Sequence, residues 1–412
     1  MNNKRPTPEL LAPAGNLEKL HTAVRYGADA VYLGGQALNL RASTQGIALD
    51  DLPAAVRLAH ASGTKVYFTM NILAREHHLD QVREYLHRLP ETGVDGIIIA
   101  DPGVLALSRE IAPDLPVHLS TQANTSNSMS IRFWQDQGVS RVNLARELSC
   151  RDIRAARKAA PDMELEVFVH GAMCMAVSGH CLLSAFLNNR SGNLGQCSHP
   201  CRFEYRPVSM ALEEKLRPGQ ITWEVEQGGE FTKIMAAEDL CLAPYLAWFK
   251  NVGVNSLKIE GRMKTSAYLA QVVDVYRTAL SDLEEGTFRP GLYLQELRQT
   301  VTRPAGSGFF APKRRTFLTP PKPEEKKSLA GLIAEPLGPG AWRVQAKNRW
   351  DHGPVELLLP GLRRPVLEKA DYGLEKETGE AVSVLHPGTW GVLRCDRPEL
   401  ETGFFVRSRS CP

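Results

Sequence analysis

The sequence predicts an α/β fold: a (β/α)8 TIM-type barrel with a cysteine-rich insertion, followed by a small all-β, barrel-like C-terminal domain. Three observations predict it. Eight short apolar runs alternate with helical patterns, which is typical of parallel strands joined by crossover helices. About eighty residues, instead of a short crossover, separate the seventh run from the eighth. After a segment rich in Pro and Lys, short strands punctuated by Gly and Pro follow.

The eight strand candidates are short, β-rich apolar runs that end in polar residues or Gly. They span residues 9–15, 29–35, 65–71, 96–101, 117–122, 141–147, 165–172 and 255–262. The segments between most of them have helical spacing, as in "NLEKLHTAVRYG" (16–27), which ends in Gly. A long helix is expected over 264–286. Eight such units fit a closed barrel in count and length, and an open doubly wound sheet is the alternative.

Three segments follow from this pattern. Residues 1–306 form the barrel and carry the insertion at about 171–245, which includes a hairpin expected around Gly228 and Gly229. Residues 307–328 are interpreted as a linker because they are rich in Pro and Lys. Residues 329–412 contain six short strand candidates and predict the small β-barrel domain.

Composition excludes few functions. The chain has 412 residues and a formal net charge of +3, which neither demands nor excludes a nucleic-acid partner, so such a partner would need a local basic patch. No apolar run is long enough to span a membrane, and the first residues lack the apolar core of a secretory signal. A cytoplasmic location is therefore expected, where thiols stay reduced.

Five of the eight cysteines lie within the insertion: four have the spacing Cys174-x6-Cys181-x15-Cys197-x3-Cys201, and the fifth, Cys241, follows in "EDLC". Loops after barrel strands form the active-site face, so these thiols lie where chemistry is expected. The spacing alone leaves three interpretations open: an iron–sulfur cluster, a zinc site, or buried thiols without a ligand. The remaining cysteines are isolated and are interpreted as ordinary thiols: Cys150, Cys395 and Cys411.

Several longer motifs carry a resemblance. They are "ELLAPAGNLEKLHTAVRYGADAVYLGG", "VFVHGAMCMAVSGHCLLS", "GQCSHPCRFEY", "EDLC" and "SLKIEGRMKTSAYLAQVVDVYR". Together they resemble the collagenase-like peptidase family over the whole barrel, and the C-terminal β-module is similar to that of its tRNA-hydroxylating branch. The resemblance implies oxygen-independent, prephenate-dependent hydroxylation of tRNA to 5-hydroxyuridine at the wobble position, with a [4Fe-4S] cluster. It implies Cys174, Cys181, Cys197 and Cys241 as ligands, with Cys201 as the alternative to Cys241.

Polar residues at the ends of the barrel strands are the other site candidates, because these ends converge on one mouth. Guanidinium groups match carboxylates, so arginines there are expected to bind a dicarboxylate such as prephenate, unless neighbouring Glu147 or Glu260 pairs with them. The predicted substrate-binding residues are Arg41, Asn71, Gln122, Arg146 and Arg262. His170 and Glu260 are the predicted catalytic residues, with a buried histidine and a structural ion pair as the alternatives.

Other functions remain open at this stage. Hydroxylation of a ribosomal RNA cytidine is the nearest alternative. A peptidase would need a nucleophile such as Cys174 beside His170, and no zinc-peptidase or nucleophile-elbow motif is present. A non-catalytic iron–sulfur accessory subunit is the third possibility. The basic residues 313–315 and the C-terminal module are expected to dock tRNA, with Phe310 and Trp350 either stacking on bases or packing in a core.

Overall fold

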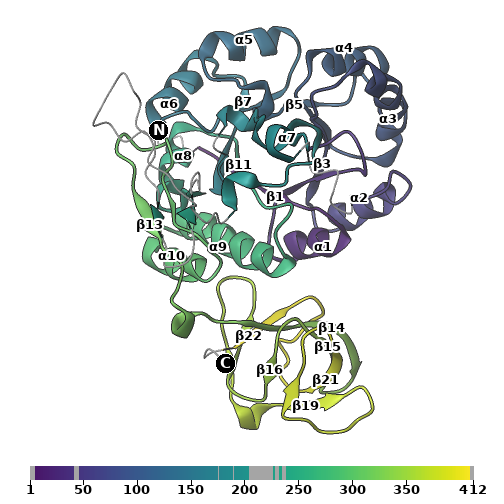
Figure 1. Cartoon of the computed structure of the whole chain (residues 1–412), viewed down its shortest axis with the longest axis vertical. Helices are drawn as coiled ribbons and strands as arrows, with labels where there is room; N and C mark the ends of the chain where they lie inside the picture. Colours follow the sequence, from purple (N-terminus) through teal and green to yellow (C-terminus); the bar gives the residue numbers. More distant parts are fainter. Residues whose placement is uncertain are drawn as a thin grey trace.

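The computed structural model describes residues 5–40, 46–174, 176–188, 190–203, 226–227, 232–233 and 238–408. Eight parallel strands form the barrel of Figure 1. They are β1 (Glu9–Pro13), β2 (Ala30–Gly34), β3 (Lys65–Met70), β4 (Gly96–Ile99), β5 (Val117–Leu119), β6 (Arg141–Asn143), β7 (Glu164–Gly171) and β11 (Ser256–Ile259). Because β11 pairs with both β1 and β7, the sheet is closed. This closure confirms the barrel and excludes the open sheet.

Helices surround the barrel (Figure 1). They are α1 (Leu17–Arg25), α2 (Leu52–His60), α3 (Leu79–Thr92), α4 (Pro102–Ile111), α5 (Ser128–Asp136), α6 (Cys150–Ala159), α8 (Leu246–Val252), α9 (Ser266–Glu285) and α10 (Pro290–Arg298). Side chains that follow the strands start several of them. Asn16, Asp101 and Ser149 each accept a backbone N–H of the first helical turn, which satisfies donors that the helix itself leaves unpaired. No helix among the described residues is both long and apolar enough to cross a membrane.

Charged side chains fill the barrel lumen near the amino ends of the strands. Arg141 pairs with Glu9 at 2.6 Å and with Glu164 at 2.7 Å. Lys258 pairs with Glu166 at 2.7 Å. Buried charges need such partners, because an unpaired ion loses its hydration without compensation. The network closes the amino end of the lumen and leaves the carboxyl end for the insertion.

The insertion begins after β7 and returns as β10 (Asp239–Cys241), which is antiparallel to β7. In between lie α7 (Leu183–Asn188) and short 3-10 turns, including η3 (Val177–Gly179). The strands β8 (Glu226–Gln227) and β9 (Thr232–Lys233) pair as the expected hairpin, whose turn at Gly228 and Gly229 lies outside the described residues.

Part of the predicted linker belongs to the barrel sheet. The strand β12 (Ala305–Gly306) pairs with β10 and with β13 (Thr316–Leu318), which lies inside the segment 307–328. Phe310 is buried against the rings of Trp248 and Phe249. The suggestion that Phe310 stacks on bases is therefore wrong, because its ring is already packed in a core.

The C-terminal region is all-β, as expected. Its seven-stranded sheet has the order β18-β17-β22-β14-β15-β21-β19, and β16 pairs with β20. The bounds are β14 (Leu329–Gly338), β15 (Ala341–Ala346), β16 (Trp350–Asp351), β17 (Val355–Leu358), β18 (Val366–Leu367), β19 (Gly373–Lys376), β20 (Val384–Leu385), β21 (Trp390–Arg394) and β22 (Phe405–Ser408). Trp350 is only 1% exposed, so base stacking by this residue is also wrong.

This module packs directly on the helices of the barrel, below α9 and α10 in Figure 1. Arg364 pairs with Asp274 of α9 at 2.7 Å, and Arg407 pairs with Glu296 of α10 at 2.9 Å. The Tyr26 hydroxyl donates to the carbonyl oxygen of Leu358 at 2.6 Å. Because these contacts are buried, the module and the barrel form a continuous structure.

Candidate functional site

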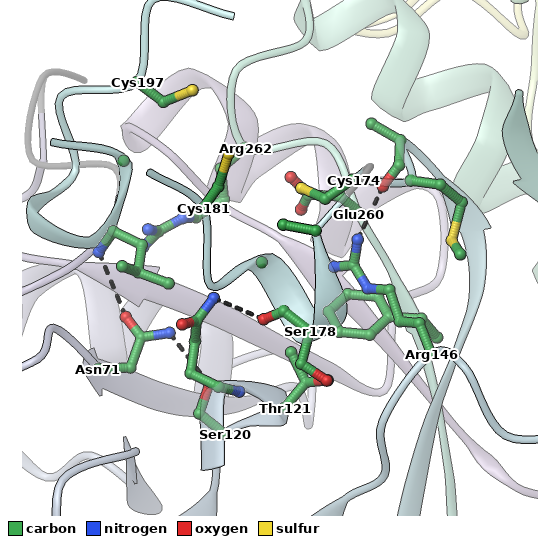
Figure 2. Close-up of a pocket in the computed structure, with 18 of the residues that line it drawn as sticks. Asn71, Ser120, Thr121, Arg146, Cys174, Ser178, Cys181, Cys197, Glu260 and Arg262 are labelled. Carbon is green, nitrogen blue, oxygen red and sulfur yellow. Dashed lines mark hydrogen bonds between the residues drawn. The ribbon is translucent and has the colours of Figure 1, made fainter. Parts of the chain in front are cut away.

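A pocket lies at the carboxyl end of the barrel, beneath the insertion, with a volume of about 140 Å³. Strand-end residues of the barrel and residues of the insertion line it together. In Figure 2 the labelled cysteines lie on one side of the pocket, and Asn71, Ser120 and Thr121 lie on the other. The insertion therefore supplies the thiols and the barrel supplies polar and charged groups.

Four cysteines line this pocket: Cys174, Cys181, Cys197 and Cys201. The Cys181 sulfur accepts the Leu183 N–H and the Cys197 sulfur accepts the His199 N–H, both at 3.4 Å. Burial raises the pKa of the Cys201 thiol, Arg202 opposes this, and the three other pocket cysteines raise it further. Amide donors two residues after a cysteine stabilise a thiolate, and such hydrogen bonds tune sulfur ligands of iron.

Cys241 has a different environment. It is fully buried in β10, opposite His170, and it does not line the pocket. Burial raises the pKa of its thiol to about 11, although a backbone amide and the Tyr276 hydroxyl lower it in part. Cys201, the predicted alternative to Cys241 as fourth ligand, thus lines the pocket with the other three cysteines. Cys241 lies in β10, outside the pocket lining.

Arg146 follows β6 and extends along the pocket wall. Its Nη1 donates to the Ala172 carbonyl oxygen at 2.7 Å, and its guanidinium lies 3.7 Å from the centre of the Phe168 ring. Its Nε is buried without a hydrogen-bond partner. Within the described residues Arg146 forms no ion pair, and Glu147 instead accepts the Ser178 N–H at 2.7 Å. The salt bridge to Glu147 that was considered for Arg146 is therefore absent from the described residues. No carboxylate among them neutralises the Arg146 guanidinium, which lines the pocket.

Arg262 and Glu260 follow β11 and also line the pocket. Arg262 is 4% exposed, and it donates to Thr69 Oγ1 and Asn39 Oδ1, both at 2.8 Å. Glu260 accepts the Tyr32 hydroxyl at 3.1 Å and the Gly261 N–H at 2.8 Å. Burial, and then the Glu260 charge, raises the pKa of Tyr32, so this hydroxyl keeps its proton.

Asn71 and Gln122 hold neighbouring segments in place while lining the pocket. Asn71 accepts the Leu40 N–H at 3.3 Å and donates to Ser120 Oγ at 3.2 Å. Gln122 Nε2 donates to the carbonyl oxygen of Ser178 in the insertion at 2.8 Å. Both residues are thus in the predicted place, whereas Arg41 lies outside the described residues.

His170 does not line the pocket. Its ring lies against α9, with Nδ1 at 3.3 Å from the Tyr276 hydroxyl, and only 3% of the residue is exposed. Burial, followed by the Lys264 charge, lowers its pKa to about 3, which keeps the imidazole neutral. The structure therefore matches the buried-histidine alternative, and His170 is not positioned to pair with Cys174.

The reason lies in the strand pairing. Phe168 pairs with Lys258, and His170 pairs with the next residue of β11, Ile259, so β7 has one extra residue there. Such a bulge redirects the following side chain. Simple alternation from Glu166 and Phe168 points His170 into the lumen, and the bulge turns it to the helical shell.

Sequence reasoning missed several pocket residues: Tyr32, Thr69, Ser120, Asn143, Ser178 and Lys258. Most lie inside strands or directly after them, where alternation of inward and outward side chains is the signal that finds them. Ser178 had no such signal. Its backbone is left-handed, with φ of 46°, and its hydroxyl bonds Asn124 and Glu147, which fastens the insertion to the barrel.

Comparison with known proteins identifies the family. The model for "Peptidase family U32" matches residues 15–318. The chain belongs to peptidase family U32. This chain is 40% identical over 317 residues to "tRNA hydroxylation protein P1" of Bacillus subtilis, and the match covers 75% of this chain and 73% of the relative. It is 38% identical over 339 residues to "tRNA hydroxylation protein P" of Escherichia coli, covering 74% of each.

Two further similarities are more distant. A "23S rRNA 5-hydroxycytidine C2501 synthase" of Escherichia coli is 33% identical over 280 residues, covering 67% of this chain and 40% of the relative. The solved structure of the U32 peptidase Mk0906 is 14% identical, with a TM-score of 0.40, and covers 63% of this chain and 95% of that one.

Proposed function

We propose that this protein hydroxylates RNA, and specifically that it forms 5-hydroxyuridine at the wobble position of tRNA in a prephenate-dependent reaction with a [4Fe-4S] cluster. The observation that carries the proposal is one pocket that combines four thiols with two arginines at the barrel mouth. The relatives support the proposal that RNA is the substrate, because this chain is similar to two tRNA hydroxylation proteins and to a ribosomal RNA hydroxycytidine synthase.

The pocket cysteines fit the proposed cluster. Cys174, Cys181, Cys197 and Cys201 line one pocket, but within the described residues no group of three or more His, Cys, Asp or Glu is arranged around a single metal ion. In a four-iron cluster each thiolate binds a different iron, whereas a zinc ion gathers its ligands at one point, so the proposed cluster needs the four thiols around one space and not around one point. A bound cluster would supply a redox-active, Lewis-acidic centre beside the substrate.

Arg146 and Arg262 are the proposed carboxylate-binding residues. They approach the pocket from β6 and β11, so two carboxylates of one small molecule would meet separate guanidinium groups. Two further cations line the pocket: Arg202 of the insertion, and Lys258, with which Glu166 already pairs. Glu260 is the proposed proton-transfer group, since its carboxylate lies at the pocket edge and holds the Tyr32 hydroxyl.

The geometry disfavours a peptidase. A thiol nucleophile needs a base within hydrogen-bond reach, and His170 lies on the shell side of β7 with a pKa of about 3. A cysteine that binds iron is also not a free nucleophile. The Cys174–His170 pair considered for a peptidase is therefore not supported by the described residues.

Nucleoside mass spectrometry of RNA from a deletion strain tests the proposal. We expect 5-hydroxyuridine-type nucleosides to disappear from tRNA and to return with the wild-type gene. Normal tRNA together with an unmodified ribosomal RNA cytidine would select the ribosomal alternative. Unchanged tRNA and ribosomal RNA would overturn RNA hydroxylation altogether.

A further inference from the structure

A second, larger cavity lies at the opposite end of the barrel from the thiols. Its volume is about 860 Å³, and it is formed by the chain before β1, the second half of α6, and the end of α8. The two helices lie side by side at one edge of the barrel in Figure 1. The cations of this basic groove are Arg5, Arg154, Arg157 and Lys158, and among the described residues no acidic side chain lines it, although Asp162 lies close enough to act on the charge of Arg157.

The cations of the groove differ in how they are used. Arg157 is structural, because it donates to the carbonyl oxygens of Gly253 and Met163. Arg154 and Lys158 are exposed and have no carboxylate partner in the part of the chain that the structure describes, and Arg154 lies 5.7 Å from the Trp248 ring centre. Like charges four residues apart weaken a helix, so the fold gains no stability from this pair.

The basic surface also continues along the helix. Arg151, Arg154 and Lys158 are exposed at positions i, i+3 and i+7 of α6, which places them on one face. The acidic residue of this helix, Asp152, accepts hydrogen bonds from the backbone N–H and the hydroxyl of Ser149, the N-cap residue. Because α6 runs from the carboxyl end of β6 to the amino end of β7, its cationic face connects the level of the thiol pocket with the basic groove.

We propose that the basic groove and the cationic face of α6 bind the phosphate backbone of the RNA substrate. This inference rests on the proposed function. A helix of ten residues is about 15 Å long, which is enough to face several consecutive phosphates. The half-buried Trp248 ring adds a surface for an unpaired base beside the charges. Among the described residues that line the groove there is no carboxylate, which favours a polyanion, and the extension of the cationic face along α6 favours a chain over a single small anion.

The test is tRNA binding by the full-length, anaerobically purified protein at several salt concentrations. Arg154→Glu with Lys158→Glu is the groove variant, and Arg151→Gln with Lys158→Gln is a milder one that alters exposed side chains. Arg57→Glu with Arg83→Glu is the matched control, because these exposed arginines of α2 and α3 give the same change in net charge. We expect the groove variant to lose at least tenfold in tRNA affinity, with a salt slope lower by about two. The control should bind like the wild type, and all variants should keep their iron.

Several outcomes would overturn the inference. Wild-type affinity in the groove variant would do so while leaving the proposed function intact. A wild-type protein that binds no tRNA would also do so, and the deletion-strain nucleosides then decide the proposed function separately. If inorganic phosphate or adenosine monophosphate binds the wild type but not the groove variant, while both bind tRNA equally, the groove is a small-anion site.

Discussion

Two arginines near the two ends of β6 illustrate how the two halves of the barrel lumen differ. Arg141 begins the strand and pairs with Glu9 and Glu164. Arg146, five residues later, donates to a neutral carbonyl oxygen and stacks on Phe168. An arginine neutralised by carboxylates stabilises the fold, whereas one held by neutral groups keeps its charge for a ligand. The amino half of the lumen is therefore structural, and the carboxyl half is suited to chemistry.

The largest expected effect concerns the thiols of the carboxyl half. Single changes of Cys174, Cys181, Cys197 or Cys201 to Ser should each remove most of the iron and abolish RNA hydroxylation, because a cluster corner loses its ligand. Iron content and visible absorbance of anaerobically purified protein measure this. Cys150→Ser and Cys395→Ser are the controls and should keep their iron. If Cys201→Ser keeps the cluster and Cys241→Ser loses it, Cys241 is the fourth ligand.

The next effect belongs to the amino half. Arg141→Met should lower the free energy of unfolding by about 3–5 kcal/mol, because it leaves Glu9 and Glu166 buried with less compensation. Urea unfolding followed by circular dichroism measures the loss, with Arg57→Met on the surface of α2 as the control. An Arg141→Met protein as stable as the control would show that this network does not hold the lumen together.

Arg146→Ala should have the opposite effect to Arg141→Met: it should weaken ligand binding and leave the stability of the fold unchanged. We expect stability and iron content to stay close to wild type, while prephenate binding weakens by about 2 kcal/mol, or roughly thirtyfold in Kd. Anaerobic calorimetric titration measures the affinity. Arg146→Lys should recover part of it, since a lysine supplies charge without the bidentate geometry. Equal loss of stability in Arg141→Met and Arg146→Ala would remove the distinction between the two halves.

The smallest effect is a pH dependence in the lumen network. Burial, followed by the charges of Arg141 and Lys258, lowers the pKa of His118 well below its ordinary value. Below a pH of about 6.5, His118 is protonated in the unfolded chain but stays neutral in the folded chain. The free energy of unfolding is therefore highest above this pH and falls as the pH drops below it. His118→Asn should flatten this part of the unfolding profile. A wild-type slope in His118→Asn would assign the pH dependence to other groups.

The sequence by itself determined the architecture. Eight apolar runs in alternation with helices require a parallel sheet, and their inward faces require closure or cover. It also located most of the site, because polar residues directly after barrel strands must converge: Asn71, Gln122, Arg146, Glu260 and Arg262 all line the pocket. The segment 307–328 was predicted less well, since its Pro and Lys content conceals the short strand β13.

Only the tertiary structure decided which similar residues belong together. Spacing places Cys201 close to Cys197 and Cys241 far from it, but only the pairing of β10 with β7 shows that Cys241 is buried opposite His170 and outside the pocket lining. His170 lost its predicted place through a single extra residue in β7, which reverses the direction of a side chain. The roles of Arg141 and Arg146 likewise depend on which carboxylates the closed barrel brings near them. Strand register and chain closure set these distances, and neither is encoded in local spacing.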